Sequence, residues 1–129
     1  MPHSIIHTDQ APAPVGPYNQ AVQAGGIIFL SGQIALDPHS GSIVGTGDVG
    51  QQAEQVMKNL AAVLNQAGVG WQQVVKTTVF LANMNDFATV NQVYAQYFDE
   101  ATAPARACVE VSRLPKDVLV EIDCIAVAS

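Results

Sequence analysis

Charged residues are scarce in this sequence, and positive charge is the scarcest. Charged residues make up 12% of the 129 residues, about half of the usual share, and five lysines and arginines stand against eleven aspartates and glutamates. The net charge of −6 makes a basic surface for nucleic acid or for an anionic membrane unexpected. So low a charged fraction also predicts that self-association covers part of the surface. Only two arginines are present, Arg106 and Arg113, so the position of each is informative.

Long apolar runs and paired cysteines are also lacking. No apolar run approaches the roughly 20 residues of a membrane-spanning helix. The N-terminal residues MPHSIIHTDQ contain neither the basic nor the apolar region of a secretory signal. The two cysteines, Cys108 and Cys124, form no CxxC motif, and strand alternation is expected to point them to opposite faces of a sheet. A disulfide between them is then geometrically poor, and we expect reduced thiols in the cytoplasm.

Two patterns associated with cofactors and metals are too weak to predict a site. The residues from Gly45 to Gly50 read GxGxxG before an expected helix, but the preceding apolar run is short and residues 65–75 contain no acid. A dinucleotide site needs both a buried strand and that acid. The sequence has three histidines, His3, His7 and His39. Their spacing is not that of metal ligands. We therefore expect neither a metal nor a cofactor.

The chain has the length of a single domain spanning residues 1–129. Apolar residues spaced three and four apart predict two helices, one beginning after Asp48 and stopping at Gly68, the other beginning after Asp86. Period-two alternation and turn residues predict strands, and these cover residues 3–7, 20–24, 27–31, 74–81, 106–112 and 118–127.

This order of elements predicts an α+β fold, a mixed β-sheet with two helices packed on one face. The apolar stripes of the two helices suffice to cover that face. Nothing else in the sequence is available to cover the other face, which again indicates self-association.

The last two expected strands carry the most informative polar residues. In ARACVEVSR (Ala105–Arg113), alternation puts Arg106 and Cys108 on one face and the intervening alanine and valines on the other, which we assign to the core. If this strand forms a hairpin with the final one, Arg106 and Cys108 share the open face with Glu121. Two interpretations remain open. One is a polar pocket at the edge of a subunit interface, and the other is an ordinary cross-strand ion pair on the surface.

Asn91 and Cys108 each have a functional and a structural interpretation. Asn91 lies four residues after Phe87, on or beside the apolar stripe of the second helix, where a polar side chain needs a partner. It either serves a site or bonds a neighbouring backbone carbonyl. Cys108 has no histidine near it in the sequence to activate the thiol, so an inert thiol or a role for its backbone is expected.

Four segments of the sequence together resemble one known family. They are APAPVGPYNQAV (Ala11–Val22), FLSGQIALDPHSG (Phe29–Gly41), VVKTTVFLANMNDFATVNQVYAQYF (Val74–Phe98) and PARACVEVSRLPKDVLVEIDCIAV (Pro104–Val127). The last segment resembles the signature PARxxVxVxxLPxxxxVEIxxIA. Over nearly its whole length the chain is similar to the RidA family of reactive intermediate deaminases, also called YjgF-type proteins.

The resemblance implies a chorismate-mutase-like fold that assembles as a homotrimer, with the uncovered sheet face inward and sites in the clefts between subunits. It also implies a hydrolase acting on C=N bonds. Such an enzyme converts 2-imino acids and their enamine tautomers, such as 2-iminopropanoate and 2-iminobutanoate, to 2-oxo acids and ammonia without a cofactor. Pyridoxal-phosphate-dependent dehydratases release these imines, so a functional association with them is implied.

The resemblance further implies roles for seven residues. Arg106 binds the substrate carboxylate, which suits a planar and permanently charged guanidinium, and Glu121 is the general acid and base for the attacking water. An arginine close to a glutamate lowers the pKa of the carboxyl group, so desolvation by a neighbouring subunit or neutralisation of the arginine by substrate is expected to offset that effect. The other residues hold or line the substrate, through the backbone of Gly32 and Cys108 and the side chains of Tyr18, Ser31 and Asn91.

One segment departs from the family pattern, and two other functional classes stay open. The loop Asp99–Ala103 is shorter than usual and has Ala103 where many members place an aromatic residue, which leaves the substrate preference open. A trimer that binds 2-oxo acids without turnover is one alternative, and the ribonuclease or chaperone activities ascribed to relatives are another. The acidic net charge disfavours the ribonuclease. Chorismate mutase is disfavoured because two arginines are too few for its dianionic substrate.

Overall fold

The computed structural model of the chain describes residues 2–128, which contain one six-stranded sheet and two α-helices. The helices are α1 (Val49–Gln66) and α2 (Phe87–Ala95). The strands are β1 (Ser4–Ile6), β2 (Ala21–Ala24), β3 (Ile27–Gln33), β4 (Val74–Leu81), β5 (Ala105–Glu110) and β6 (Val120–Val127). Every predicted strand and helix is confirmed, and the bounds of β4 are those predicted.

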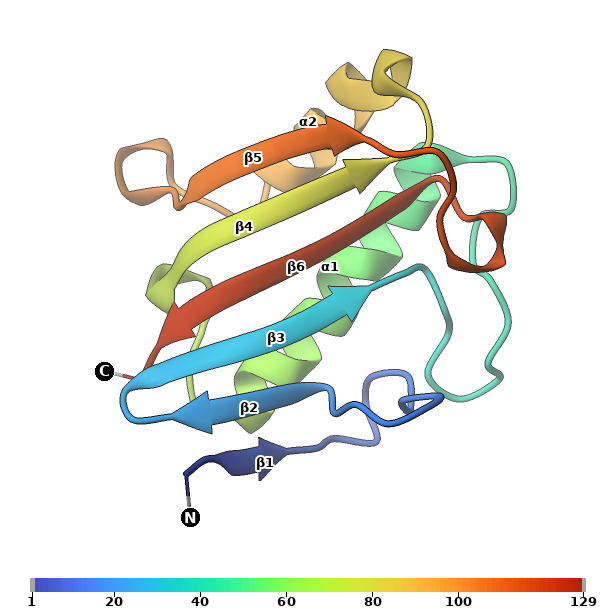
Figure 1. The fold of residues 1–129 in the computed structure, drawn as a ribbon. Helices are drawn as coiled ribbons and strands as arrows, with labels where there is room; N and C mark the ends of the chain where they lie inside the picture. Colours follow the sequence, from blue (N-terminus) through green and yellow to red (C-terminus); the bar gives the residue numbers. More distant parts are fainter. Residues whose placement is uncertain (1, 129) are drawn as a thin grey trace.

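The strands lie side by side in the order β1-β2-β3-β6-β4-β5 (Figure 1). Neighbouring strands are antiparallel except β4 and β5, which are parallel. Because parallel strands need a crossover connection, the chain passes through α2 between them. In this order β6, the last strand along the chain, lies between β3 and β4, and β5 lies at an edge of the sheet.

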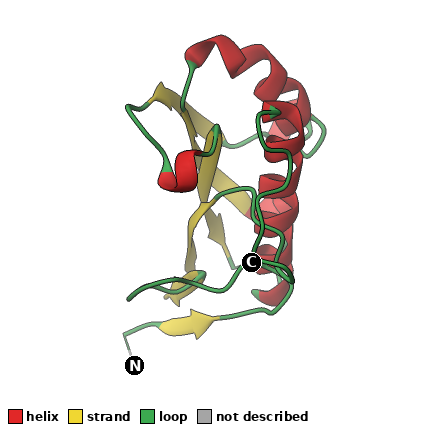
Figure 2. Cartoon of the chain, turned by 90° about the vertical axis from the view of Figure 1, so that its right-hand side faces the viewer, coloured by secondary structure: helices red, strands yellow, loops and turns green. Residues whose placement is uncertain are grey.

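Both helices cover the same face of the sheet and leave the opposite face bare (Figure 2). Alternate residues of β6 are buried under the helices, among them Ile122 and Cys124. They meet the apolar stripe of α1, where Val56 and Leu60 are fully buried. The predicted α+β arrangement of one sheet with two helices on one face is therefore confirmed. Neither helix of the described chain is long and apolar enough to cross a membrane.

The two helices begin differently from one another. Asp48 caps α1 as predicted, because its Oδ1 accepts a hydrogen bond from the backbone N–H of Gln51 at 3.0 Å. The prediction that Asp86 caps α2 is wrong. A single 3₁₀ turn precedes α2, and Asn83 caps that turn by accepting from the N–H of Asn85, while Asp86 makes no capping hydrogen bond. The 3₁₀ turn moves the exposed N–H groups three residues upstream, where an asparagine already stands.

The GxGxxG segment is a packed turn leading into α1. Gly45 has φ +75°, and a Cβ there would lie 2.6 Å from Cβ of Gln51. The side chain of Gln52 donates to the carbonyl of Gly45 at 3.1 Å. The turn therefore needs glycine for its backbone conformation and for its close approach to the helix.

The predicted orientation of β5 is wrong. β5 does not form a hairpin with β6 but pairs in parallel with β4, where Arg106 lies opposite Thr77 and Cys108 opposite Val79. Thr77 and Val79 are buried on the helix-covered face, so Arg106 and Cys108 lie on that face too. Val109 lies on the bare face and is 41% exposed. Alternation had separated the two sets of residues correctly, but the apolar set does not face the core.

The cysteines consequently lie on the same face of the sheet, against the prediction. Cys124 is buried in β6 and Cys108 is half-buried in β5, and both thiols are free. Strand β4 runs between them, so two inter-strand spacings, about 10 Å, separate their backbones. That distance exceeds the reach of a disulfide.

Candidate active site

Arg106 is held against α2 by three side chains of that helix. Its Nη1 donates a hydrogen bond to Oδ1 of Asn91 at 2.8 Å. Its guanidinium carbon lies 4.8 Å from the ring centre of Tyr94 and 5.5 Å from that of Phe87, which is within the range of cation–π attraction. Tyr94 is itself fixed by a 2.7 Å hydrogen bond between its hydroxyl and that of Thr77. Asn91 thus has the partner that its place on the helix required.

The guanidinium faces a hollow and keeps its charge available. Within residues 2–128, no carboxylate lies within 4 Å of Arg106. A hollow of about 430 Å³ adjoins it, lined by Asn91, Tyr94, Ala95, Phe98, Glu100, Ala103 and Arg106. An arginine that is oriented by neutral groups and open on one side is suited to bind an anion.

Cys108 packs against the core beside Arg106 and does not have the environment of a nucleophile. Burial raises the pKa of its thiol, and the nearby charge of Arg106 opposes that shift only in part. A thiol with a raised pKa is protonated and weakly reactive at neutral pH. Its backbone is better placed for a role, because β5 pairs with a neighbour on one side only. Some of the backbone N–H and C=O groups of β5 therefore point away from β4.

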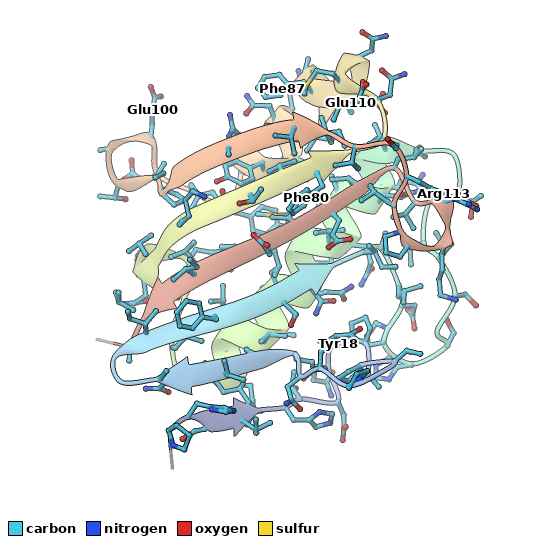
Figure 3. All side chains as sticks on the ribbon, in the orientation of Figure 1. Tyr18, Phe80, Phe87, Glu100, Glu110 and Arg113 are labelled. Atoms are coloured by element: carbon cyan, nitrogen blue, oxygen red, sulfur yellow. The ribbon has the colours of Figure 1, made fainter. Side chains whose placement is uncertain are left out.

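Glu121 lies on the bare face of β6, opposite Phe80 of β4, which Figure 3 labels. The side chain is half-buried, and burial, followed by the negative charge of Asp123 two residues on, raises the pKa of its carboxyl group. Gly32 lies directly against it, since a Cβ at that glycine would come within 2.1 Å of Oε2 of Glu121. A carboxyl group with a raised pKa holds its proton more readily than an ordinary glutamate, which suits a group that gives and takes protons.

A second hollow, of about 320 Å³, opens in front of Glu121 and contains three of the other predicted site residues. Its lining is Tyr18, Ser31, Gly32, Ile34, Pro115 and Glu121. Ser31 and Gly32 lie where the pairing of β3 with β6 shifts register, between Leu30 and Gln33. Such a bulge re-aims side chains and backbone near active sites.

Gln20 holds the loop that carries Tyr18, and the sequence analysis missed this residue. Its side-chain nitrogen donates to the carbonyls of Thr8, Ala11 and Pro12, and its oxygen accepts from the N–H of Thr8. The side chain is 2% exposed. A proline-rich loop lacks backbone donors, so a glutamine shortly after such a loop was the sequence signal that could have been used.

Arg106 and Glu121 lie on opposite faces of the sheet, so the prediction that they share a face is wrong. Strand β4 also separates their strands. Figure 3 shows that the residues around them are also separated across the strands, with Tyr18 near the β1–β2 side and Phe87 beyond β5. Arg106 is not among the groups that act on the carboxyl of Glu121, so the expected lowering of its pKa by the arginine is absent as well. One chain therefore holds two candidate half-sites, one around Arg106 and one around Glu121, on opposite faces of its sheet.

Comparison with known proteins identifies the family. The family described as Endoribonuclease L-PSP matches residues 8–128. The chain belongs to this family. Its members include the RidA and YjgF proteins, so the resemblance seen in the sequence is confirmed.

Three members of the Endoribonuclease L-PSP family show how similar the chain is to known proteins. A RutC family protein of Synechocystis is 69% identical over 127 residues, which cover 98% of each chain. A Salmonella typhimurium protein named 2-iminobutanoate/2-iminopropanoate deaminase is 51% identical over 124 residues and 95% of each chain. The crystal structure of E. coli TdcF with bound serine matches with a TM-score of 0.90 at 48% identity, covering 98% of this chain and 99% of that one.

Proposed function

We propose that this protein hydrolyses 2-imino acids and their enamine tautomers, among them 2-iminopropanoate and 2-iminobutanoate, to 2-oxo acids and ammonia. The observation that carries the proposal is the half-buried carboxyl of Glu121, with its raised pKa, set against Gly32 in a hollow of the bare sheet face. The name of the Salmonella relative supports the reaction. The serine bound by TdcF supports a ligand with the size and the carboxylate of a small amino acid.

The proposed site is completed by a second copy of the chain, in a homotrimer whose bare sheet faces turn inward. The separation of the two half-sites supports this assembly, because the arginine of one copy and the glutamate of another can face a single cleft. The bare face also carries large exposed apolar side chains, including Phe29 (43% exposed) and Val109 (41%). Apolar patches of this kind mark interfaces between proteins.

In the proposed reaction Arg106 binds and orients the substrate. Its fork of N–H donors takes up the carboxylate, and the hydrogen bond to Asn91 with the rings of Tyr94 and Phe87 limits the positions of the guanidinium. Binding through the carboxylate leaves C2 of the substrate and its imine nitrogen directed out of the hollow, toward the half-site of the other copy.

Glu121 supplies the proton transfers. Its carboxylate takes a proton from water as the water oxygen bonds to C2, and this proton passes to the imine nitrogen. The resulting carbinolamine then loses its hydroxyl proton through Glu121 to the nitrogen, the C2–N bond breaks, and ammonia and the 2-oxo acid leave. Both protons gained by nitrogen come from the water, so the reaction needs no further reactant. A raised pKa suits a group that acts as base and then as acid.

A coupled assay tests the proposal. A threonine dehydratase acting on its substrate supplies the imine, and loss of the imine is followed with and without this protein. We expect acceleration by the wild type, a loss of about 10²–10⁴ in kcat for Glu121→Gln, and a raised KM for Arg106→Lys, whose ammonium lacks the planar fork. Lys58→Ala, an exposed cation on α1, is the control and keeps full activity. No acceleration by the intact wild-type assembly contradicts the proposal.

A trimer that binds 2-oxo acids without turnover is the second candidate, favoured by the Arg106 hollow, which can take up a carboxylate without help from Glu121. Thermal stabilisation by 2-oxobutanoate without imine loss in the coupled assay supports this candidate. The ribonuclease activity named in the family description fits poorly with a net charge of −6.

A further inference from the structure

A third hollow, which the proposed reaction does not use, has walls of aromatic rings. It measures about 340 Å³ and lies where the 3₁₀ turn η1 (Trp71–Gln73) meets the residues that follow α2. The ring of Trp71 lies 5.4 Å from that of Tyr97 at an interplanar angle of 61°, and 5.1 Å from that of Phe98 at 79°. The ring of Trp71 is thus inclined steeply to both other rings, and the three side chains, all partly exposed, line one hollow.

The remaining lining of this aromatic hollow is polar and carries negative charge only. Gln72, Asp99 and Thr102 complete the lining, so it contains one carboxylate and no lysine or arginine. Asp99 is exposed, and one of its oxygens accepts from the N–H of Ala101 at 3.1 Å. A second carboxylate, that of Glu54, accepts a hydrogen bond from the hydroxyl of Tyr97. Asp99 in the lining and Glu54 beside Tyr97 thus both contribute negative charge near the hollow.

The hydroxyl of Tyr97 stays protonated and keeps its ring in place. Burial, together with the hydrogen bond to Glu54 and the charge of that carboxylate, raises the pKa of Tyr97 to about 12. The ring is therefore neutral at every physiological pH, and its position is tied to α1 through Glu54. A fixed ring is preorganised for a ligand, because no side-chain entropy is lost when the ligand binds.

We propose that the aromatic hollow binds a methylated ammonium ion. The faces of aromatic rings attract cations, most strongly for tryptophan, and groups of such rings recognise quaternary ammonium ligands. Methyl groups fill a space walled by carbon, and the carboxylate of Asp99 balances the charge. A metal ion is a poorer match, since the lining offers too few oxygen ligands.

The site is separate from the Arg106 half-site, although Phe98 lines both. The Arg106 hollow contains a guanidinium together with the carboxylate of Glu100, whereas the aromatic hollow contains a carboxylate and no cation, so a cationic ligand is expected to prefer the aromatic hollow. Binding in the aromatic hollow therefore does not depend on the deaminase proposal, and its test needs no enzymatic assay.

Trp71 allows a direct test because it is the only tryptophan in the sequence. Choline is titrated into the wild-type protein at constant ionic strength while Trp71 fluorescence is recorded, and the neutral isostere 3,3-dimethylbutan-1-ol is titrated in parallel. We expect a saturable change with choline and affinity about tenfold weaker, or more, for the isostere, as cation–π attraction requires. No saturation at about 100 mM choline, or equal affinity for the neutral isostere, overturns the proposal.

Two variants with a matched control identify the groups involved. Asp99→Asn keeps the oxygen that accepts from Ala101 but removes the charge, and we expect choline affinity to fall by about twofold to fivefold. Tyr97→Leu removes one aromatic ring from the lining and is expected to lower the choline affinity further. Asp9→Asn changes an exposed carboxylate outside the hollow and is expected to leave the choline affinity unchanged. Equal affinities of wild type, Asp99→Asn and Tyr97→Leu overturn the assignment.

Discussion

Two neighbours give Glu121 its chemical character. Gly32 leaves room for the carboxylate on the bare face, and Asp123 adds negative charge that favours the protonated form. The sequence predicted Glu121 and Gly32 through the family resemblance. Asp123 was given no role, although it lies two positions further along the same strand and therefore on the same face. At the residue scale, the position of the Glu121 carboxylate depends on the missing side chain of Gly32, and its pKa depends in part on the charge of Asp123.

Gly32→Ala is expected to abolish most activity while the protein stays folded. The added Cβ would lie 2.1 Å from Oε2 of Glu121, so the carboxylate must move, and displacement by about 1 Å costs on the order of 100-fold in rate. The imine assay and a thermal unfolding curve measure the two effects. Gly26→Ala is the control, since its Cβ meets nothing within 4 Å. Equal activity of the two variants contradicts this role of Gly32.

The pH dependence of the reaction follows from the raised pKa of Glu121. The carboxylate form accepts the proton from water, so kcat/KM falls as the pH drops through this pKa, above the ordinary glutamate value of 4.5. Asp123→Asn removes the neighbouring charge and moves the acidic limb to lower pH. A pH–rate profile of each protein measures the shift, and coincident acidic limbs contradict the assignment.

The same pKa predicts that Glu121 reduces the stability of the fold at neutral pH. A carboxyl whose pKa is higher in the folded state binds its proton more tightly there, so its contribution to stability is lost as the pH rises through the folded-state value. We expect Glu121→Gln to have a higher Tm than the wild type near pH 7, and the difference to shrink toward pH 4. Thermal unfolding across pH measures it. A Tm difference that grows on acidification contradicts the prediction.

At the scale of elements, β5 shows where sequence reasoning ended. Alternation sorted its residues into two sets, and the outline of strands and helices was correct, because spacing alone determines both. Which set faces the helices depends on the pairing partner. β5 pairs with β4 and receives α2 above it, so Arg106 extends along the rings of that helix, a packing that a cation tolerates through its long apolar stem and its planar group.

The two helix starts provide a matched test of capping. Asp48→Ala removes a hydrogen bond to the backbone of α1 and is expected to lower the free energy of unfolding by about 1 kcal/mol. Asp86→Ala removes no capping hydrogen bond and is expected to have a clearly smaller effect. Urea denaturation at one protein concentration compares the two. An equal loss in both variants contradicts the assignment of Asn83 as the cap before α2.

At the scale of the whole molecule, the bare sheet face is the feature that the sequence predicted best. Low charge and the shortage of helices both indicated a face without cover, and Figure 2 shows it. The sequence could not indicate that the face would carry Glu121 without Arg106. That division results from the order of strands in the sheet, which depends on contacts far apart in the chain.

Phe29→Glu is expected to prevent assembly. Phe29 is 43% exposed on the bare face, and a carboxylate placed there must be desolvated when two copies meet. Sedimentation velocity should show a trimer for the wild type and a smaller species for the variant, which loses imine hydrolysis as well. Lys58→Glu, on the exposed side of α1, is the control and stays assembled. A wild-type monomer with full activity contradicts the shared site.

The place of β6 also affects how the protein is made. β3 and β4 do not pair with each other, and only β6, the last strand to be synthesised, joins them. Until residues 120–127 have left the ribosome, the growing chain holds two separate groups of strands with unpaired edges. Such edges are prone to aggregation. The native sheet therefore closes only once β6 has emerged, and until then an edge of β3 and an edge of β4 stay unpaired.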